Sequence, residues 1–204
     1  MSKTLSTSKR NLRFTLYIRT MGHAIRTYSD HYTVSDWEKW KDQWELIDGM
    51  PYCMSPAPSI RHQQINLALS SILAEKLKST NCKKCKVLIP IDWQISNDTV
   101  VQPDIMVYCK PLPEIRITET PEAIFEILSP STERKDRNEK FSLYEAQKVK
   151  TYTLIDPVLE VIEIFELDEN DKYFRKSKGS HYRYLFGDCP VEIDFQVIWD
   201  ELAS

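Results

Sequence analysis

The clearest periodic pattern in the chain falls in residues 56–79, where apolar positions recur every three or four residues. This spacing gives one apolar stripe on a helix, formed by Ile65, Leu69, Ile72 and Leu73. Ser59 suits the start of that helix, and His62 continues the stripe into its first turn. The pattern predicts a long helix packed on a core along one side.

Apolar and β-branched segments follow this helix and predict a sheet. The expected strands cover residues 86–95, 99–108, 122–128, 151–157, 161–167 and 181–186, and residues 191–199 suit either a strand or a short helix. A second helix is expected from about Arg134 to Lys148, and a short one over residues 33–42. Asp48-Gly49 predicts a hairpin over residues 44–55. The order of elements predicts an α+β fold, a mixed β-sheet flanked by helices with an N-terminal hairpin extension.

Two of the predicted strands each carry one carboxylate among apolar neighbours. Because side chains alternate along a strand, Asp104 shares a face with Met106, and Glu126 shares one with Ile124. If the strands are neighbours, the two acids lie side by side, where they repel each other and lose hydration. Mg²⁺ bound between them would relieve both costs, but a network of ion pairs gathers carboxylates equally well. Pro103 favours a bend in the strand directly before Asp104.

The second predicted helix offers a cation to these acids. Asp136, Lys140 and Tyr144 lie four residues apart and therefore share one face. Lys140 could reach the end of the sheet from that face and neutralise charge on a phosphate that is being cleaved. The alternative interpretation is an ordinary surface pair with Asp136 or Tyr144.

Composition narrows the class of protein. The chain has 204 residues, is 42% hydrophobic and carries a formal net charge of -3, as in soluble globular proteins. The mild acidity argues against a dedicated nucleic-acid binder but not against an enzyme with a local basic strip. No apolar run reaches the length that crosses a bilayer. We expect one domain over residues 29–204, preceded by a flexible N-terminal arm, residues 1–28.

Five cysteines at irregular spacing suggest free thiols in a reducing, cytoplasmic setting. Cys82 and Cys85 form a C-x-x-C pair, but a zinc site needs four ligands. Cys109 and His181 lie far away in the sequence, so we interpret the pair as thiols in a loop.

Several of these segments together resemble one family of nucleases. The segments are ELIDG (45–49), SIRHQ (59–63), VVQPDIMV (100–107), EILSPST (126–132), DRNEKFSLY (136–144) and YTLIDP (152–157). In this order they are similar to the Uma-two family of restriction endonucleases, which belongs to the PD-(D/E)XK nuclease superfamily. The resemblance covers roughly residues 30–167 and implies a restriction-endonuclease-like core.

The resemblance implies roles for particular residues. Asp104 and Glu126 would bind the metal, with the carbonyl of Ile127 as a further ligand. The lysine that the superfamily carries two residues after the second acid is replaced here by Leu128. Lys140 would supply the cation from the following helix, as in other members of the family.

Lys140 has one rival, and two further residues are candidates of second rank. Lys135 is the nearest rival of Lys140 for the role of the cation. Glu45 matches the glutamate of the family's ELIDG segment, and its alternative role is that of a strand acid beside the Asp48-Gly49 turn. His62 lies near the place where the superfamily often has a polar site residue, although a histidine on an apolar stripe is more often a hydrogen-bonded core residue.

The function implied by the resemblance is Mg²⁺-dependent hydrolysis of double-stranded DNA, with Mn²⁺ as a substitute for Mg²⁺. Two basic runs could contact phosphates, or could be solvated charges: Lys83 and Lys84, and Arg134, Lys135 and Arg137. Nucleases that cut both strands often act as homodimers.

Two other functions fit the same residues. A binding module for nucleic acid or protein could retain the fold without catalysis. A glycosidase could use Asp104 and Glu126 as acid and nucleophile, and would work without a metal.

Overall fold

The centre of the molecule is a mixed six-stranded sheet, in the order β10-β9-β8-β7-β6-β3. Its strands are β3 (Lys86–Leu88), β6 (Ile105–Tyr108), β7 (Ala123–Ile127), β8 (Thr151–Asp156), β9 (Val161–Leu167) and β10 (Tyr173–Lys178). All pairs are antiparallel except β7 and β8, which are parallel. Every residue of β6 and β7 is buried because helices cover both faces of the sheet there. This computed structural model describes residues 30–54 and 57–203.

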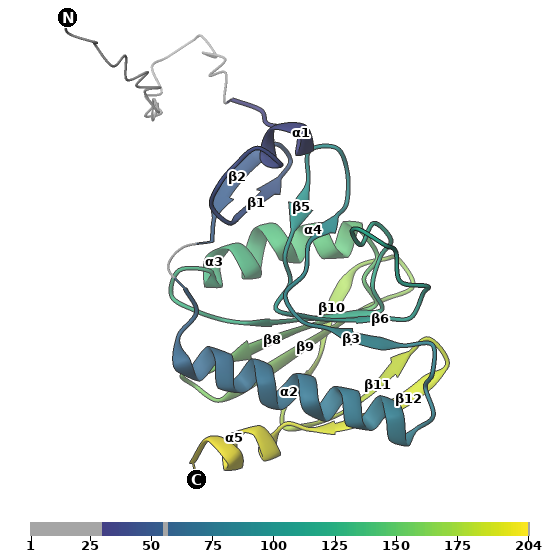
Figure 1. The fold of residues 1–204 in the computed structure, drawn as a ribbon. Helices are drawn as coiled ribbons and strands as arrows, with labels where there is room; N and C mark the ends of the chain where they lie inside the picture. The colour runs from purple at the N-terminus through teal and green to yellow at the C-terminus, as the bar shows by residue number, and fades with distance from the viewer. Residues whose placement is uncertain (1–29, 55–56, 204) are drawn as a thin grey trace, which may run out of the picture. The chain divides into compact units, whose positions relative to one another are not determined.

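Helices lie on both faces of this sheet (Figure 1). On one face lies α2 (Ile60–Ser79), with α5 (Gln196–Ala203) and the hairpin of β11 (His181–Phe186) and β12 (Cys189–Asp194). On the other lies a helical segment with three parts, α3 (Glu133–Lys135), η1 (Asp136–Lys140) and α4 (Phe141–Ala146). This segment makes the crossover between the parallel strands β7 and β8. The predicted α+β fold with a flanked mixed sheet is confirmed.

A smaller sheet, in the order β2-β1-β5-β4, lies beside the crossover segment. Its strands are β1 (Trp44–Ile47), β2 (Met50–Cys53), β4 (Trp93–Gln94) and β5 (Val100–Val101). Asp48 and Gly49 have φ angles of 49° and 74°, the left-handed conformation that a two-residue hairpin turn requires. The predicted N-terminal hairpin is confirmed. The helix before it, α1 (Val34–Trp37), is shorter than predicted.

The predicted strand over residues 99–108 is in fact two strands that belong to different sheets. β5 pairs with β1 and β4, whereas β6 pairs with β3 and β7. Residues 102–104 separate them, and Pro103 in this break cannot donate a backbone hydrogen bond to either ladder. The strand predicted over residues 86–95 divides in the same way, into β3 and β4. β10 was not predicted.

Four cysteines are paired, so the prediction of free thiols is wrong for them. Cys82 is bonded to Cys189, and Cys85 to Cys109, across sequence separations of 107 and 24 residues. Only the folded chain brings these segments to one edge of the central sheet, which is why spacing did not reveal the pairs. Cys53 is free and exposed. The inference of a reducing compartment rested on free thiols and loses that support.

The described residues from His31 onward form one compact unit. The expected N-terminal arm, residues 1–28, lies outside the described residues. Among residues 30–54 and 57–203, no helix combines the length and the apolar character needed to cross a membrane.

A candidate active site at the break between the two sheets

The break between β5 and β6 frees two backbone amides, and both donate to glutamates. The Gln102 amide lies 2.8 Å from Oε1 of Glu45, which is on β1. The Asp104 amide lies 3.2 Å from Oε2 of Glu126, which is on β7. Pro103, between them, has no amide hydrogen to satisfy. The interruption of the strand therefore gathers acids from both sheets at one point.

Asp104 and Glu126 come together through the register of two neighbouring strands. Ile105 lies opposite Phe125, and Met106 opposite Ile124, so the next pair in this register is Asp104 and Glu126. The Ile127 amide donates to Oδ2 of Asp104 at 2.8 Å, which fixes that carboxylate against the end of β7. The side-by-side placement expected from the sequence is present.

The crossover segment brings Lys140 between the glutamates. Its Nζ lies 2.8 Å from Oε1 of Glu45 and 2.8 Å from Oε1 of Glu126, and 3.8 Å from Oδ1 of Asp136. The Tyr144 hydroxyl also donates to Oε1 of Glu126, at 2.8 Å. Lys140 ends η1, a π-helical turn of the kind often found inside helices at functional sites. The Lys140 side chain is 4% exposed, so the surface-pair alternative does not describe it.

Lys135, the rival cation, reaches Glu45 instead of Glu126. Its Nζ pairs with Oε2 of Glu45 and lies 5.8 Å from the centre of the Tyr52 ring. Glu45 therefore holds one lysine on each carboxylate oxygen. The two lysines have separate positions, and Lys140 is the one that contacts both glutamates.

The first turns of α2 supply polar groups from the opposite face of the sheet. Ser59 caps the helix by accepting a hydrogen bond from the His62 amide at 3.2 Å. The cap places the His62 ring so that Nε2 lies 3.2 Å from Oδ2 of Asp104. Asn66, one turn further along, donates from its side chain to the Asp104 carbonyl at 3.2 Å. Asp104 is therefore held by α2 on one side and by β7 on the other.

The electrostatics of the cluster oppose ionisation of Glu126. Burial raises the pKa of Glu126, and although Lys140 opposes this, the charges of Asp136, Asp104 and Glu45 raise it further, to about 8. For Glu45 burial acts in the same direction, but Lys140 and Lys135 outweigh it and hold the pKa below its ordinary value. The Lys140 ammonium group thus lies near three carboxylates, those of Glu45, Glu126 and Asp136, and Glu45 also pairs with Lys135.

The other groups of the cluster respond to the same charges. Burial acts to lower the pKa of Lys140, but Glu126, Glu45 and Asp136 together raise it well above its ordinary value. Burial likewise acts to lower the pKa of His62, but the hydrogen bond with Asp104 and the charges of Asp104 and Asp136 together raise it. Burial raises the pKa of Asp136 against the opposing effect of Lys140.

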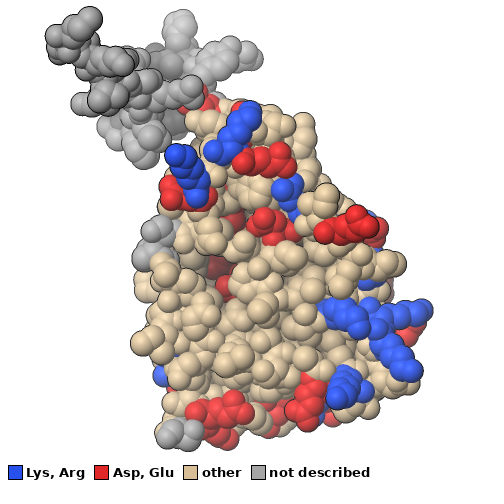
Figure 2. All heavy atoms as spheres, viewed as in Figure 1, with Lys and Arg blue, Asp and Glu red and all other residues tan. Residues whose placement is uncertain are grey.

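The carboxylate oxygens of this cluster are the ligand type that a divalent cation prefers, although no three side chains in the described residues are already arranged around one metal position. The cluster's carboxylates are Glu45, Asp104, Glu126 and Asp136, and its ammonium groups are those of Lys135 and Lys140. With neutral His62 and all four carboxyl groups ionised, this set carries a surplus of two negative charges, which one Mg²⁺ would balance. Oδ1 of Asp136 is buried without a hydrogen-bond partner. Asp104 is the acid nearest to solvent, with 21% of its side chain exposed. Figure 2 shows acidic atoms recessed in a hollow beneath the β1–β2 hairpin.

The two predicted basic runs are not at the same place. Lys135 belongs to the cluster, and Arg134 is exposed beside it on α3. Arg137 is paired with Glu133 and Glu163. Lys83 and Lys84 follow the C-terminal end of α2, whereas His62 is at its beginning, about 25 Å away at 1.5 Å per residue. Their contact with nucleic acid stays a prediction, separate from this cluster.

Sequence reasoning missed two contributors to the cluster. Asp136 was interpreted only as a surface partner of Lys140, but it is 2% exposed and faces the other acids. Asn66 was not considered; its position one turn after His62 on the same helix was the available signal.

The central mixed sheet, with helices on both faces and a helical crossover between β7 and β8, is a fold also found in a solved structure. A crystal structure from Anabaena variabilis, titled as that of "a putative nuclease belonging to DUF820", has this fold. It superimposes with a TM-score of 0.69 at 16% identity, over 84% of this chain and 99% of that one.

The family can be stated more narrowly. The model of the Uma2 family, described as "Putative restriction endonuclease", matches residues 30–181, so the chain belongs to this family. It is also 26% identical over 169 residues to an uncharacterized protein of Synechocystis sp., covering 81% of this chain and 88% of that protein.

Proposed function

We propose that the protein is a metal-dependent endonuclease that hydrolyses phosphodiester bonds of double-stranded DNA. One observation carries the proposal: four carboxyl groups from four separate segments converge on only two lysines, so that their full ionisation leaves a surplus of two negative charges. A cluster needed only for stability would be expected to balance its charges, because an unpaired buried carboxylate costs several kcal/mol. Family membership supports the same reaction class.

Asp104 and Glu126 would hold Mg²⁺, with Mn²⁺ as a substitute. The backbone carbonyl of Ile127 is a suitable third ligand. The amide and the carbonyl of one strand residue point toward the same neighbouring strand. Because the Ile127 amide points at Asp104, the Ile127 carbonyl points to that side as well. The Ile127 carbonyl also contributes to the raised pKa of His62, which places it on the side of Asp104. When bound, the metal ion would activate water and stabilise charge on the phosphate.

The chain's own residues would do the remaining work. Glu45 holds Lys135 and Lys140 in place through its two oxygens. Lys140 is bound to Glu126 in the structure, so cation binding at Glu126 would weaken that contact and leave the ammonium group able to orient the attacking water. His62 and Asn66 fix Asp104, and Tyr144 fixes Glu126. Arg134, exposed at the edge of the cluster, would contact the phosphate backbone.

Cleavage of plasmid, linear duplex and single-stranded DNA by the purified full chain tests this proposal. We expect nicking or linearisation of plasmid with Mg²⁺ or Mn²⁺, and none with a chelator. Asp104→Ala and Glu126→Gln should each lower the rate at least 100-fold. Glu122→Gln is the matched control, because Glu122 directly precedes β7 and contacts Lys150 and the Gly187 amide, outside the cluster.

Two results would contradict the assignment in different ways. Equal activity of wild type and both variants would remove Asp104 and Glu126 from catalysis. DNA binding without cleavage, unaffected by metal or by Asp104→Ala, would indicate a binding module that retains the fold.

A further inference from the structure

Four of the five cysteines meet at one edge of the central sheet, at the end of α2 far from the carboxylates. Cys82 and Cys85 lie in the turn after α2, Cys109 directly follows β6, and Cys189 begins β12. The disulfides join Cα atoms 5.9 Å apart for Cys82 and Cys189, and 3.9 Å apart for Cys85 and Cys109. Three parts of the fold that are distant in sequence thus supply four sulfur atoms to one place.

The two disulfides are themselves neighbours. The Cys85 amide donates to the Cys82 carbonyl at 3.3 Å, which closes a tight turn. Such a turn brings the two Cα atoms within about 7 Å. The sulfurs of a tetrahedral zinc site, each about 2.3 Å from the metal, lie about 3.8 Å apart. Opening each disulfide to that separation moves its two sulfurs apart by about 1.8 Å, because a disulfide bond is about 2.0 Å long.

The surroundings suit a metal bound by four thiolates. Cys82 and Cys85 are buried, and C-x-x-C with two further cysteines is the usual ligand pattern of structural zinc sites. The Thr80 hydroxyl lies 3.3 Å from the Cys82 sulfur, where it can donate to a thiolate.

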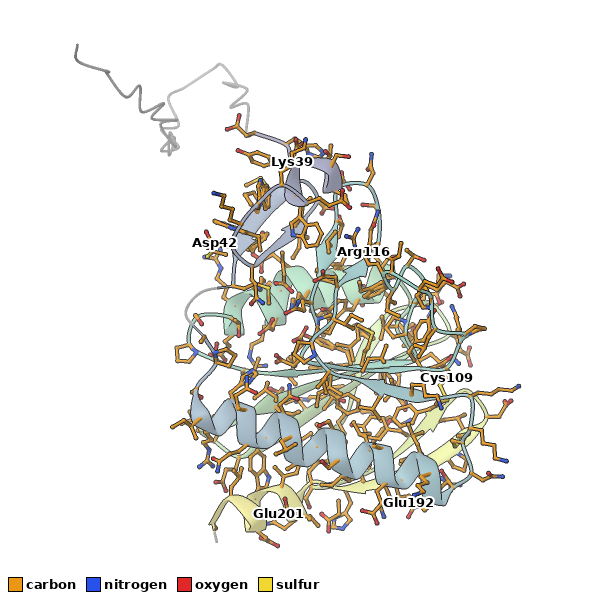
Figure 3. The ribbon with its side chains drawn as sticks, in the orientation of Figure 1. Lys39, Asp42, Cys109, Arg116, Glu192 and Glu201 are labelled. Carbon is orange, nitrogen blue, oxygen red and sulfur yellow. A yellow bond between two sulfur atoms is a disulfide. The ribbon has the colours of Figure 1, made fainter. Side chains whose placement is uncertain are left out.

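Lysines next to these cysteines would balance the charge of such a site. Zinc with four thiolates carries a net charge of −2. The adjacent lysines are Lys83, Lys84, Lys86 and Lys110. Figure 2 shows basic side chains gathered on the side of the molecule where Figure 3 labels Cys109. This gives the basic run after α2 a role that does not involve nucleic acid.

We propose that the reduced protein binds one Zn²⁺ through Cys82, Cys85, Cys109 and Cys189. Each disulfide takes two electrons and two protons from a dithiol reductant, which becomes a cyclic disulfide. The four thiols then release four protons as the thiolates bind the metal. The four-cysteine site keeps α2, β6 and the β11–β12 hairpin joined in both states. In the disulfide form, no group of three or more His, Cys, Asp or Glu side chains in the described residues is arranged for a metal.

Cobalt binding to the full chain tests this directly. The protein is reduced with a dithiol, freed of it without oxygen, and titrated with Co²⁺. We expect thiolate-to-cobalt charge-transfer absorption that saturates at one equivalent and disappears when Zn²⁺ is added. The carboxylate cluster contains no sulfur and cannot give this absorption, so the result does not depend on the proposed nuclease function.

Substitutions and thiol counting complete the test. Cys53→Ser, in the free cysteine, should leave the absorption unchanged, whereas Cys109→Ser should abolish or greatly weaken it. In the wild type, which needs no variant to fold, one equivalent of Zn²⁺ should protect four of five thiols from a thiol reagent. The proposal is overturned if the wild type gives no charge-transfer band, or if Zn²⁺ leaves all five thiols equally reactive.

Discussion

The raised pKa of Glu126 predicts that ionisation of this one residue destabilises the protein as pH rises. The carboxyl group has a pKa of about 8 in the folded chain against an ordinary value of 4.5. Below pH 4.5 both the folded and the unfolded chain hold the proton. Between the two values only the folded chain holds it, so stability falls with rising pH and levels off above about 8.

The size of this effect follows from the two pKa values. Between these two pKa values, each rise of one pH unit lowers the free energy of unfolding by about 1.4 kcal/mol. Between pH 5 and pH 8 the loss amounts to about 3–4 kcal/mol, because the folded carboxyl group is half ionised at the upper end. Lys140, Tyr144 and the Asp104 amide are the contacts that limit the loss to this size.

Urea denaturation of the wild type and of Glu126→Gln at pH 5 and pH 8, with a chelator, measures this loss. The glutamine has similar shape and no titration. The glutamine cannot make all the hydrogen bonds of the glutamate, and this loss changes the variant's free energy of unfolding equally at both pH values. Relative to this variant, the wild type should lose about 3–4 kcal/mol between pH 5 and pH 8. Groups that the substitution does not affect, His62 among them, cancel in the comparison.

The reasoning is refuted if the two proteins differ in free energy of unfolding by the same amount at pH 5 and pH 8, within about 0.5 kcal/mol. That outcome would mean that Glu126 ionises normally in the folded chain, because Lys140 fully offsets burial and the neighbouring carboxylates. The argument for a divalent cation would then lose its electrostatic support.

Three further outcomes follow from the same contacts. Mg²⁺ should raise the midpoint of thermal unfolding of the wild type, and should do so more at pH 8 than at pH 6. It should not raise the midpoint of Glu126→Gln, and an equal rise in both proteins would contradict binding at Glu126. Lys140→Met should destabilise the protein by about 3–5 kcal/mol, or about 6–20 °C in a thermal melt, and adding Glu126→Gln should restore part of this. Arg134→Ala should weaken binding of duplex DNA and reduce its salt dependence more than Lys83→Ala does, as measured by fluorescence anisotropy at several salt concentrations.

Much of the fold was readable from the sequence because it depends on local patterns. The apolar stripe of residues 60–79 and the cap at Ser59 specify α2 without reference to the rest of the chain. Asp48 and Gly49 specify the hairpin because few other pairs adopt the left-handed conformation at low cost. In the candidate site, strand alternation placed Asp104 and Glu126 together, and helical spacing put Lys140 on the face that reaches them.

Other features depend on contacts between residues far apart in sequence, and only the tertiary structure decided them. Residues 99–108 have the composition of one strand, but Glu45 and Glu126 capture the two free amides at residues 102 and 104 and divide it between two sheets. The burial of Asp136, and the choice of Lys140 over Lys135 as the partner of Glu126, follow from how the crossover segment packs.

The cysteines illustrate the same limit. Their spacing along the chain is irregular, yet the fold brings four of them into contact at the end of α2. Sequence thus determined the elements and the residue types available for chemistry, because those depend on propensity and period. The tertiary structure determined which charges share one buried volume, because burial and pairing are set by the whole chain.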